Sequence, residues 1–175
     1  MEIKQIPLTV VTPSPMNPRK TFEQEGLQEL ADNIEKQGLL QPITVRPIHD
    51  LSKFPDAEGT PEYEIVCGER RYRAFRILSA KWSGIDVVAP KGASYNRFTE
   101  ISAIIREMTD REAKEAMITE NLQRKDVDPI EEAASISELL EMGYTAEEVA
   151  HRIGKSIPFV RNRVKLNSLV PELML

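Results

Sequence analysis

A change of periodicity near residue 109 divides this chain into two parts. Before residue 109, short runs rich in Ile, Val and Tyr alternate with two amphipathic segments and with proline-rich loops. After it, four consecutive segments each begin with residues that are typical of a helix N-terminus. The sequence therefore predicts an α+β protein, with a small mixed-sheet domain over residues 1–108 and an all-helical domain over residues 109–175.

The N-terminal part is predicted to contain five strands and two helices. Apolar residues at 27, 30, 31 and 34 have the spacing of an amphipathic helix, and Gly38 is placed to cap its C-terminus. A second helix is expected over residues 71–81, and long loops over 49–62 and 90–99. The expected strands are residues 2–11, 42–48, 63–67, 85–89 and 100–108.

The C-terminal part is predicted to contain four capped helices. Thr109 with Glu112 opens the first, to about residue 122, and Asp128 with Pro129 opens the second. Thr145 with Glu148 forms another capping box. The fourth helix follows Ser156 and is expected to end near residue 166.

Composition excludes several classes of protein. No run approaches the ~18 apolar residues of a transmembrane helix, and the N-terminus lacks the features of a signal peptide, so a cytoplasmic protein is expected. The single Cys67 excludes an intramolecular disulfide and any multi-cysteine zinc site. His49 and His151 lie too far apart in the sequence for metal-ligand spacing.

The net charge of −5 is unevenly divided between the two parts. Residues 145–175 carry five basic and three acidic side chains, for a formal charge of +2, and residues 1–144 carry the remaining −7. The overall acidity therefore does not exclude nucleic acid as a partner of the C-terminal part.

Residues 146–166 have the pattern of a helix-turn-helix. Ala150 supplies the small side chain that a close helix crossing needs, and Gly154 is placed at the turn. The second helix would lie in the major groove of DNA, where Arg and Asn suit contacts to guanine and adenine. The polar positions predicted to contact DNA are Lys155, Ser156, Arg161, Asn162 and Lys165. The alternative is a pair of bundle helices with a solvated basic face.

The segment GERRYR, from Gly68 to Arg73, lies where a strand is expected to end and a helix to begin. A helix N-terminus offers free N–H groups that suit phosphate, and a glycine lets the backbone approach closely. Arginines there add donors that match phosphate oxygens, although their charge is unfavourable at that helix end without an anionic partner. The segment indicates a phosphate site, with a solvated basic helix start as the alternative.

Two further segments could contribute to a ligand site. In ENLQR, Glu120 and Asn121 offer oxygens that suit Mg²⁺ held together with substrate phosphates, although a polar helix end would explain them equally well. The residues of the loop GLLQP, from Gly38 to Pro42, could wrap a ligand or simply connect a helix to a strand.

Taken together, these motifs resemble the ParB family of partition proteins. GLLQPITVRP, YEIVCGERRYRAFR, ENLQRKDVDPIEEA and the helix-turn-helix occur in the order and spacing of that family, and NPRKTF is similar to its start. The resemblance implies a ParB/sulfiredoxin-like N-terminal domain that binds CTP and Mg²⁺, and a helical domain that binds a palindromic centromere-like site on double-stranded DNA. It also implies a clamp: CTP drives self-association of two N-terminal domains, and slow CTP hydrolysis reopens it.

The resemblance assigns roles by position. Gly68, Glu69, Arg70 and Arg71 would contact the triphosphate, and Glu69 would take part in hydrolysis. Glu120 and Asn121 would hold Mg²⁺, and Arg124 would lie near the phosphates. The residues that would approach the cytosine and sugar are Gly38, Leu39, Gln41 and Pro42.

The resemblance also frames the expected partners and alternatives. A ParA-type ATPase is a possible partner, and the location would be the nucleoid or a plasmid in the cytoplasm. Because the chain ends at Leu175, the family's C-terminal dimerisation domain is expected to be absent. A transcriptional regulator without CTP switching and a ParB-like nuclease remain alternatives. Cys67 precedes the motif at a strand end, where a buried structural thiol is expected rather than a reductase nucleophile.

Overall fold

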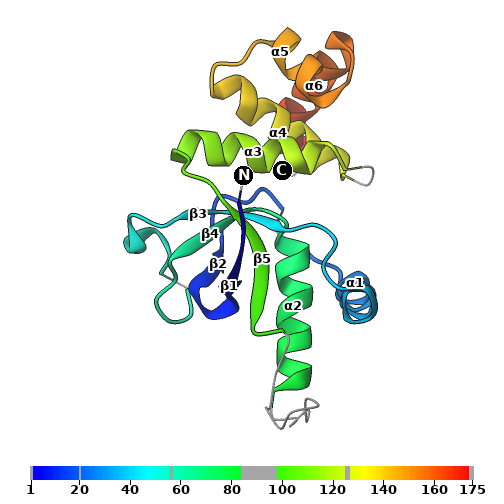
Figure 1. The fold of residues 1–175 in the computed structure, drawn as a ribbon. Helices are drawn as coiled ribbons and strands as arrows, with labels where there is room; N and C mark the ends of the chain where they lie inside the picture. Colours follow the sequence, from blue (N-terminus) through cyan, green and yellow to red (C-terminus); the bar gives the residue numbers. More distant parts are fainter. Residues whose placement is uncertain (1, 20, 56, 84–97, 125–126, 174–175) are drawn as a thin grey trace, which may run out of the picture. The chain divides into compact units, whose positions relative to one another are not determined.

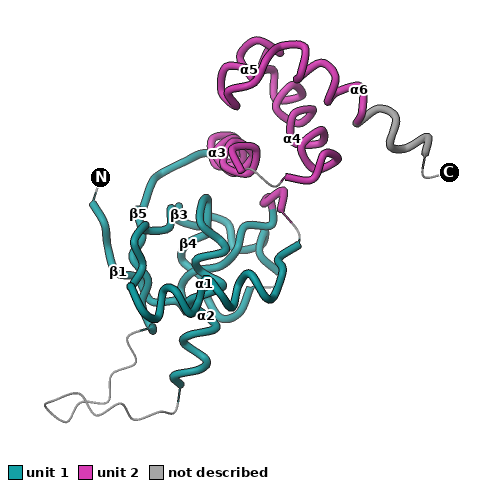
Figure 2. Tube along the Cα trace, turned by 90° about the vertical axis from the view of Figure 1, so that its right-hand side faces the viewer, with its two compact units in different colours: residues 1–15, 21–109 teal, residues 16–20, 110–175 magenta. Residues whose placement is uncertain are grey.

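The computed structural model describes residues 2–19, 21–55, 57–83, 98–124 and 127–173, and the chain folds into two compact units (Figure 1). Unit 1 comprises residues 1–15 and 21–109, and unit 2 comprises residues 16–20 and 110–175 (Figure 2). The predicted α+β class is confirmed, because the sheet lies in unit 1 and unit 2 is helical. Among the described residues no helix has both the length and the apolar character needed to cross a membrane.

Unit 1 is built on a mixed five-stranded sheet with the order β1-β5-β3-β4-β2. The strands are β1 (Ile3–Pro7), β2 (Val11–Pro13), β3 (Ile43–Pro47), β4 (Tyr63–Cys67) and β5 (Glu100–Ile105). β5 runs antiparallel to β1 and parallel to β3, and β4 runs antiparallel to β3 and parallel to β2. A register shift interrupts the β3–β4 pairing between Thr44 and Val45.

The prediction of one strand over residues 2–11 is wrong. The chain forms β1, then the 3-10 turn η1 (Leu8–Val10), and then β2 at the opposite edge of the sheet. Pro7 ends β1 because it has no N–H to offer the ladder. After Pro7, the Leu8 N–H donates to the Thr99 carbonyl (2.9 Å), whereas the Val10 carbonyl accepts from the Glu62 N–H (2.8 Å). The expected strand over 85–89 lies outside the described residues.

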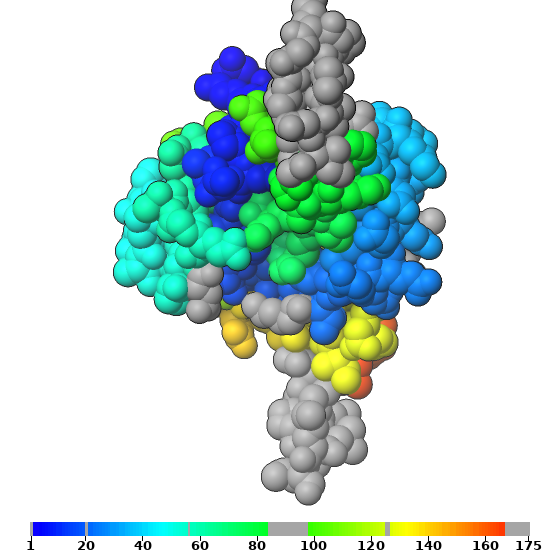
Figure 3. Space-filling view, turned by 90° about the horizontal axis from the view of Figure 1, so that it is seen from below, coloured from blue at the N-terminus to red at the C-terminus, as the bar shows by residue number. Residues whose placement is uncertain are grey.

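The described part of unit 1 also contains two α-helices, α1 (Gln24–Gln37) and α2 (Glu69–Trp82), which lie side by side (Figure 1), and a short 3-10 helix, η2 (Leu51–Lys53). Seen from below, the surface of α2 lies between α1 and the N-terminal segment (Figure 3). The inner face of α2 buries Tyr72, Phe75 and Leu78 in the same core as Ile43 and Ile101 of the sheet. That packing fixes the first turn of α2 against the end of β4.

Unit 2 contains α3 (Asp110–Leu122), α4 (Pro129–Glu141), α5 (Ala146–Ile153) and α6 (Ile157–Leu173). The predicted caps at Asp128 and at Thr145 with Glu148 are confirmed by their side-chain hydrogen bonds. α6 is longer than predicted and runs beyond residue 166. Its side chains are buried with those of three other helices in a second core, formed by Ile118, Leu122, Ile136, Leu139, Val149, Ala150, Ile153 and Val160.

Candidate functional site

The turn from β4 into α2 depends on Gly68. Its backbone is left-handed (φ 96°, ψ 27°), and its carbonyl accepts from the N–H groups of Arg71 (3.0 Å) and Tyr72 (3.2 Å). A Cβ at this position would lie 2.9 Å from Arg71 Nη2 and 3.0 Å from Ile43 Cγ2. Only glycine fits both the backbone conformation and the space. The turn therefore exposes the positive end of α2 directly after a buried strand.

The arginines of this turn are held by backbone carbonyls. Arg71 Nη1 donates to the carbonyl oxygens of Gln41 (2.8 Å) and Pro42 (2.6 Å), and Arg70 Nη2 donates to that of Gly26 (3.3 Å). Arg71 thereby joins the GERR turn to the loop of residues 38–42. The structure brings together two of the three segments that the sequence singled out for a ligand.

Glu69 is buried in the first turn of α2, with 7% of its surface exposed. Its Oε1 accepts from Arg73 Nε (2.8 Å) and lies 2.6 Å from Arg73 Nη2. The Arg73 guanidinium also lies 4.2 Å from the centre of the Phe22 ring. The sequence counted Arg73 among the arginines that could bind phosphate. Its pairing with Glu69 and its contact with Phe22 were not predicted, although the i,i+4 spacing of Glu69 and Arg73 is a recognisable signal for an ion pair.

The loop of residues 38–42 begins at the end of α1. The N–H of Gly38 donates to the Ile34 carbonyl (2.8 Å) with φ at 80°, which confirms the predicted C-cap. Leu39 packs against the core, whereas Leu40 has 81% of its surface exposed. Gln41 is exposed and Pro42 is half-buried, so the loop offers backbone and side-chain groups beside the arginine turn.

Two neighbouring residues are also informative. Tyr72 has a structural role, and Cys67 is more exposed than predicted. Burial raises the pKa of the Tyr72 phenol, and its hydroxyl donates to the Val11 carbonyl (2.8 Å), which occupies an acceptor of β2. Cys67 is half-buried rather than buried, because it lies in the last position of β4, where the strand leaves the core.

The segment ENLQR ends α3 and belongs to unit 2, so its geometry is described by itself. Glu120 is exposed, whereas Asn121 has only 2% of its surface exposed. Arg124 Nη1 donates to Asn121 Oδ1 (3.1 Å). The buried Asn121 Nδ2 has no hydrogen-bond partner among the described residues.

These donors fit Mg²⁺ only in part. No group of three His, Cys, Asp or Glu side chains in the described part of the chain could hold a metal ion. Glu120 offers the two oxygens of its carboxylate and Asn121 offers Oδ1, which already accepts a hydrogen bond from Arg124 Nη1. Mg²⁺ keeps several water or phosphate ligands in proteins, so a phosphate-bearing ligand would have to complete the coordination.

The helix-turn-helix geometry of α5 and α6 is present. Gly154 ends α5 in the left-handed conformation (φ 66°), and the Lys155 N–H donates to the Ala150 carbonyl (3.0 Å). Ser156 Oγ accepts from the Phe159 N–H (3.3 Å) at the start of α6. The polar positions predicted for DNA are all exposed, namely Lys155, Ser156, Arg161, Asn162 and Lys165.

Some basic side chains of this unit contact other residues of it. Arg161 Nη2 lies 3.6 Å from Glu147 Oε1, and Lys155 Nζ lies 5.3 Å from the centre of the Phe159 ring. Arg163 pairs with the buried Glu132 of α4 (Nε to Oε2 2.7 Å), a contact that was not predicted from the sequence. Arg163 therefore fixes α6 on α4 and leaves the other positions on the exposed face.

The fold and these motifs define a class of protein in which an α+β unit with an arginine-bearing turn is joined to a helix-turn-helix unit. The ParB N-terminal domain model matches residues 1–122, and the ParB HTH domain model matches residues 125–174. The chain belongs to the ParB family.

Individual relatives agree with this assignment. The chain is 43% identical over 170 residues to the chromosome-partitioning protein Spo0J of Thermus thermophilus, a match that covers 97% of this chain and 52% of that protein. The chain thus spans about half the length of this curated relative.

Two crystal structures of C-terminally truncated ParB from Caulobacter crescentus are also similar. The complex with the centromeric parS site matches at 31% identity with a TM-score of 0.64, over 98% of this chain and 79% of that one. The complex with CTP-gamma-S matches at 34% identity with a TM-score of 0.50, over 99% of this chain and 83% of that one.

Proposed function

We propose that this chain is the nucleotide- and DNA-binding part of a CTP-dependent DNA clamp that acts in chromosome or plasmid partition. One observation carries the proposal: the chain is similar, over nearly its whole length, to a ParB that has been crystallised both with parS DNA and with CTP-gamma-S. Its location would be the nucleoid or a plasmid in the cytoplasm.

In unit 1, CTP would bind at the turn between β4 and α2. Arg70, Arg71 and the N–H groups that follow Gly68 would hold the triphosphate at the helix end. The residues of the 38–42 loop, which Arg71 already contacts, would approach the base and sugar. Glu120, Asn121 and Arg124 of unit 2 would supply Mg²⁺ ligands and a further phosphate contact, once Arg124 leaves Asn121 Oδ1. Glu69 would take part in slow hydrolysis.

Titration calorimetry tests the nucleotide site. In the presence of Mg²⁺ the chain should bind CTP in preference to ATP, GTP and UTP. Arg70→Ala should lower the affinity for CTP at least tenfold, since it removes a charge-assisted contact of roughly 1.5–3 kcal/mol, and leave DNA binding intact. Arg76→Ala is the matched control, because Arg76 lies on the same helix and its described contacts are with the exposed Glu58 and with Tyr72. Equal affinity for CTP, ATP, GTP and UTP would refute the proposal that CTP controls the clamp.

In unit 2, the exposed face of α6 would enter the major groove of a palindromic site. Asn162→Ala should weaken binding to a parS duplex by about 1–3 kcal/mol and relax specificity. Lys165→Ala should weaken binding to every duplex alike and reduce the salt dependence. Fluorescence anisotropy at several salt concentrations distinguishes the two outcomes, and identical losses on specific and random DNA for Asn162→Ala would count against base readout.

The clamp itself requires self-association of the N-terminal domains on CTP. Crosslinking of the chain with and without CTP and parS DNA should show a second copy only when both are present. A chain that binds parS but never crosslinks would favour the alternative, a ParB-like regulator without CTP switching. Nicking of supercoiled plasmid with Mg²⁺, lost in Glu69→Ala, would favour the ParB-like nuclease. A ParA-type ATPase is the further expected partner.

A further inference from the structure

A cavity of about 590 Å³ opens in unit 1 between α2 and the segments that lead into β2 and β4. Two of its walls, α2 and the N-terminal segment, lie side by side in Figure 3. Its volume is within the range of small-molecule sites, about 300–1,000 Å³. The residues that line it include none from the GERR turn and none from the loop of residues 38–42. The cavity is therefore separate from the candidate nucleotide site.

The cavity has a buried floor and a charged rim. Val11, Thr12 and Tyr72 line it with 8% or less of their surface exposed. At the rim, Arg76 Nη2 donates to Glu58 Oε2 (2.9 Å). These two are the charged residues among those that line the cavity, so a ligand would meet one cation, and that cation already holds a carboxylate.

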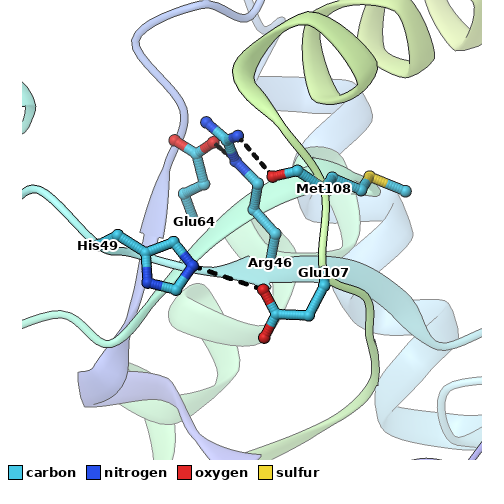
Figure 4. Close-up of polar contacts among 5 residues, drawn as sticks. All are labelled: Arg46, His49, Glu64, Glu107 and Met108. Atoms are coloured by element: carbon cyan, nitrogen blue, oxygen red, sulfur yellow. Dashed lines mark hydrogen bonds and ion pairs between the residues drawn. The ribbon is translucent and has the colours of Figure 1, made fainter.

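The pair at the rim differs from the ion pair inside the sheet. Arg46 on β3 donates through Nε to Glu64 Oε1 on β4 and through Nη1 to the Met108 carbonyl (3.0 Å) (Figure 4). Glu64 has 1% of its surface exposed, so a ligand cannot replace it. The side chains of Arg76 and Glu58 are 50% and 82% exposed. An exposed ion pair contributes little to stability, so a ligand can take the place of Glu58 at small cost.

The geometry around Arg76 suits a planar anion. Tyr72 contacts the Arg76 side chain from the floor of the cavity, and the Tyr72 hydroxyl is itself held because it donates to the Val11 carbonyl (2.8 Å). A guanidinium binds a carboxylate through two parallel hydrogen bonds. A single cation matches a single negative charge, which favours a monocarboxylate over a phosphate monoester with its higher charge.

The floor favours a small molecule over a peptide that adds to the sheet. β2 is an edge strand, where an extended peptide could pair with free backbone groups. The Val10 carbonyl accepts from the Glu62 N–H (2.8 Å) on the β4 side, so the next carbonyl, that of Val11, faces the open side. Because Tyr72 already donates to the Val11 carbonyl, this acceptor is not available to a peptide.

We propose that this cavity is a second ligand site of unit 1, which binds a small organic acid through Arg76. The carboxylate of the ligand replaces that of Glu58 on the guanidinium. Leu8 and Ala80 offer apolar contact to the body of the ligand, and Thr9 and Thr12 offer hydroxyl groups. Glu58 competes with the ligand for Arg76 and so lowers the affinity of the site.

Titration with hexanoate, followed by ¹H–¹⁵N NMR, tests the site. Hexanoate should shift the amide signals of lining residues such as Thr12, Gly59 and Ser79. Hexanamide, which has the same body without the charge, should bind at least about fivefold more weakly. Arg76→Ala should lower the affinity for hexanoate about fivefold, as expected for a charge-assisted contact on a half-exposed side chain.

Glu58→Gln gives the opposite change. Because it removes the competing carboxylate, the affinity for hexanoate should rise about two- to fivefold. The matched control is Glu62→Gln, which removes an equal charge from an exposed residue of the same loop that does not line the cavity. The affinity of this control should stay within about twofold of wild type.

The two sites of unit 1 are tested separately. Arg70→Ala should keep hexanoate binding, whether or not the chain binds CTP, so failure of the nucleotide site does not affect this test. Displacement of hexanoate by CTP would overturn the proposal, because the two ligands would then share one site. The absence of shifts at tens of millimolar hexanoate, equal binding of hexanamide, or unchanged affinity in a folded Arg76→Ala would overturn it as well. Tighter binding of tetraalanine than of hexanoate would assign the cavity to the carboxyl end of a peptide instead.

Discussion

The two units are held together by different kinds of contact. Unit 1 pairs segments that are far apart in the chain, as in Ile3 with Ile104 across β1 and β5, and it buries an ion pair between neighbouring strands. Unit 2 begins its helices with contacts between near neighbours, such as Thr145 with Glu148 and Asp128 with Ile130. A substitution in the sheet of unit 1 should therefore lower the free energy of unfolding by a large amount, whereas the loss of a helix cap in unit 2 should lower it by a small amount.

The candidate sites differ in the same way. In unit 1 the motif arginines already donate to carbonyls of other segments, so a ligand would meet side chains that are held in place. In unit 2 the polar positions of α6 are exposed on one face of a helix whose opposite side is buried. The only tryptophan, Trp82, lies in unit 1, so its fluorescence follows that unit, while far-UV circular dichroism follows the helices of both.

The largest effect is expected from Arg46→Ala. It leaves the buried Glu64 carboxylate without its partner, which should lower the free energy of unfolding of unit 1 by about 3–5 kcal/mol. Urea titration followed by Trp82 fluorescence measures the loss. Arg46→Met with Glu64→Leu is the control and should recover most of it. A loss below ~1 kcal/mol for the single variant would show that water reaches Glu64.

Gly68→Ala should lower the free energy of unfolding of unit 1 by a smaller amount, about 2 kcal/mol, measured in the same urea titration. The left-handed backbone costs a non-glycine residue about 1–2 kcal/mol, and the new Cβ would press on Arg71 and Ile43. CTP binding should fall with it, because Arg71 would be displaced from the 38–42 loop. Gly59→Ala is the control, since Gly59 also has positive φ (73°) but no atom within 4 Å of the added Cβ. Equal losses at both positions would mean that the close approach to Arg71 is unimportant.

In unit 2, Thr145→Ala should cost only about 1 kcal/mol, the usual loss for an N-cap. The capping box is removed, so α5 loses the hydrogen bond from the Glu148 N–H to Thr145 Oγ1 (3.2 Å). The loss should appear in the circular dichroism transition and not in Trp82 fluorescence. Glu141→Gln, on an exposed helix end, should change neither. A shift in the fluorescence transition would contradict the separation of the two units.

The smallest effect is a pH dependence carried by Glu148. Hydrogen bonds from the Thr145 N–H (2.8 Å) and the Thr145 hydroxyl (3.0 Å) lower the pKa of this carboxyl from its usual value of 4.5. Because the pKa is lower in the folded state, the stabilisation is present above the unfolded pKa and is lost as the pH falls through the folded one. The difference in melting temperature between wild type and Glu148→Gln should therefore shrink from about pH 6 to about pH 3. A constant difference would contradict this origin.

The sequence predicted the local features and missed the long-range ones. The caps at Gly38, Asp128 and Thr145 could be identified because each depends on a few adjacent residues. The division of residues 2–11 into two edge strands could not, because it depends on partners near residues 62 and 99. Nor could the pairing of Arg46 with Glu64, which needs the strand register beside a bulge.

The candidate site shows the same division. The glycine, the arginines and the exposed polar face of the helix-turn-helix were evident from residue types and spacing. The contact of Arg71 with the 38–42 loop, and that of Arg73 with Phe22, depend on how distant segments pack. The residues that hold a site in place are therefore harder to predict than those that would touch a ligand.

The two edge strands have a consequence for how the chain folds during synthesis. β1 emerges from the ribosome first, yet its partner β5 lies about a hundred residues later in the chain. At the other edge of the sheet, β2 can pair only after β4 has been synthesised. Pairings of such high sequence separation form slowly. Until residue 105 has emerged, the N-terminal segment has no strand to close against at the β1 edge. The helices that follow rely on nearby contacts and can form as they appear, so closure of the sheet should be the slow step in folding.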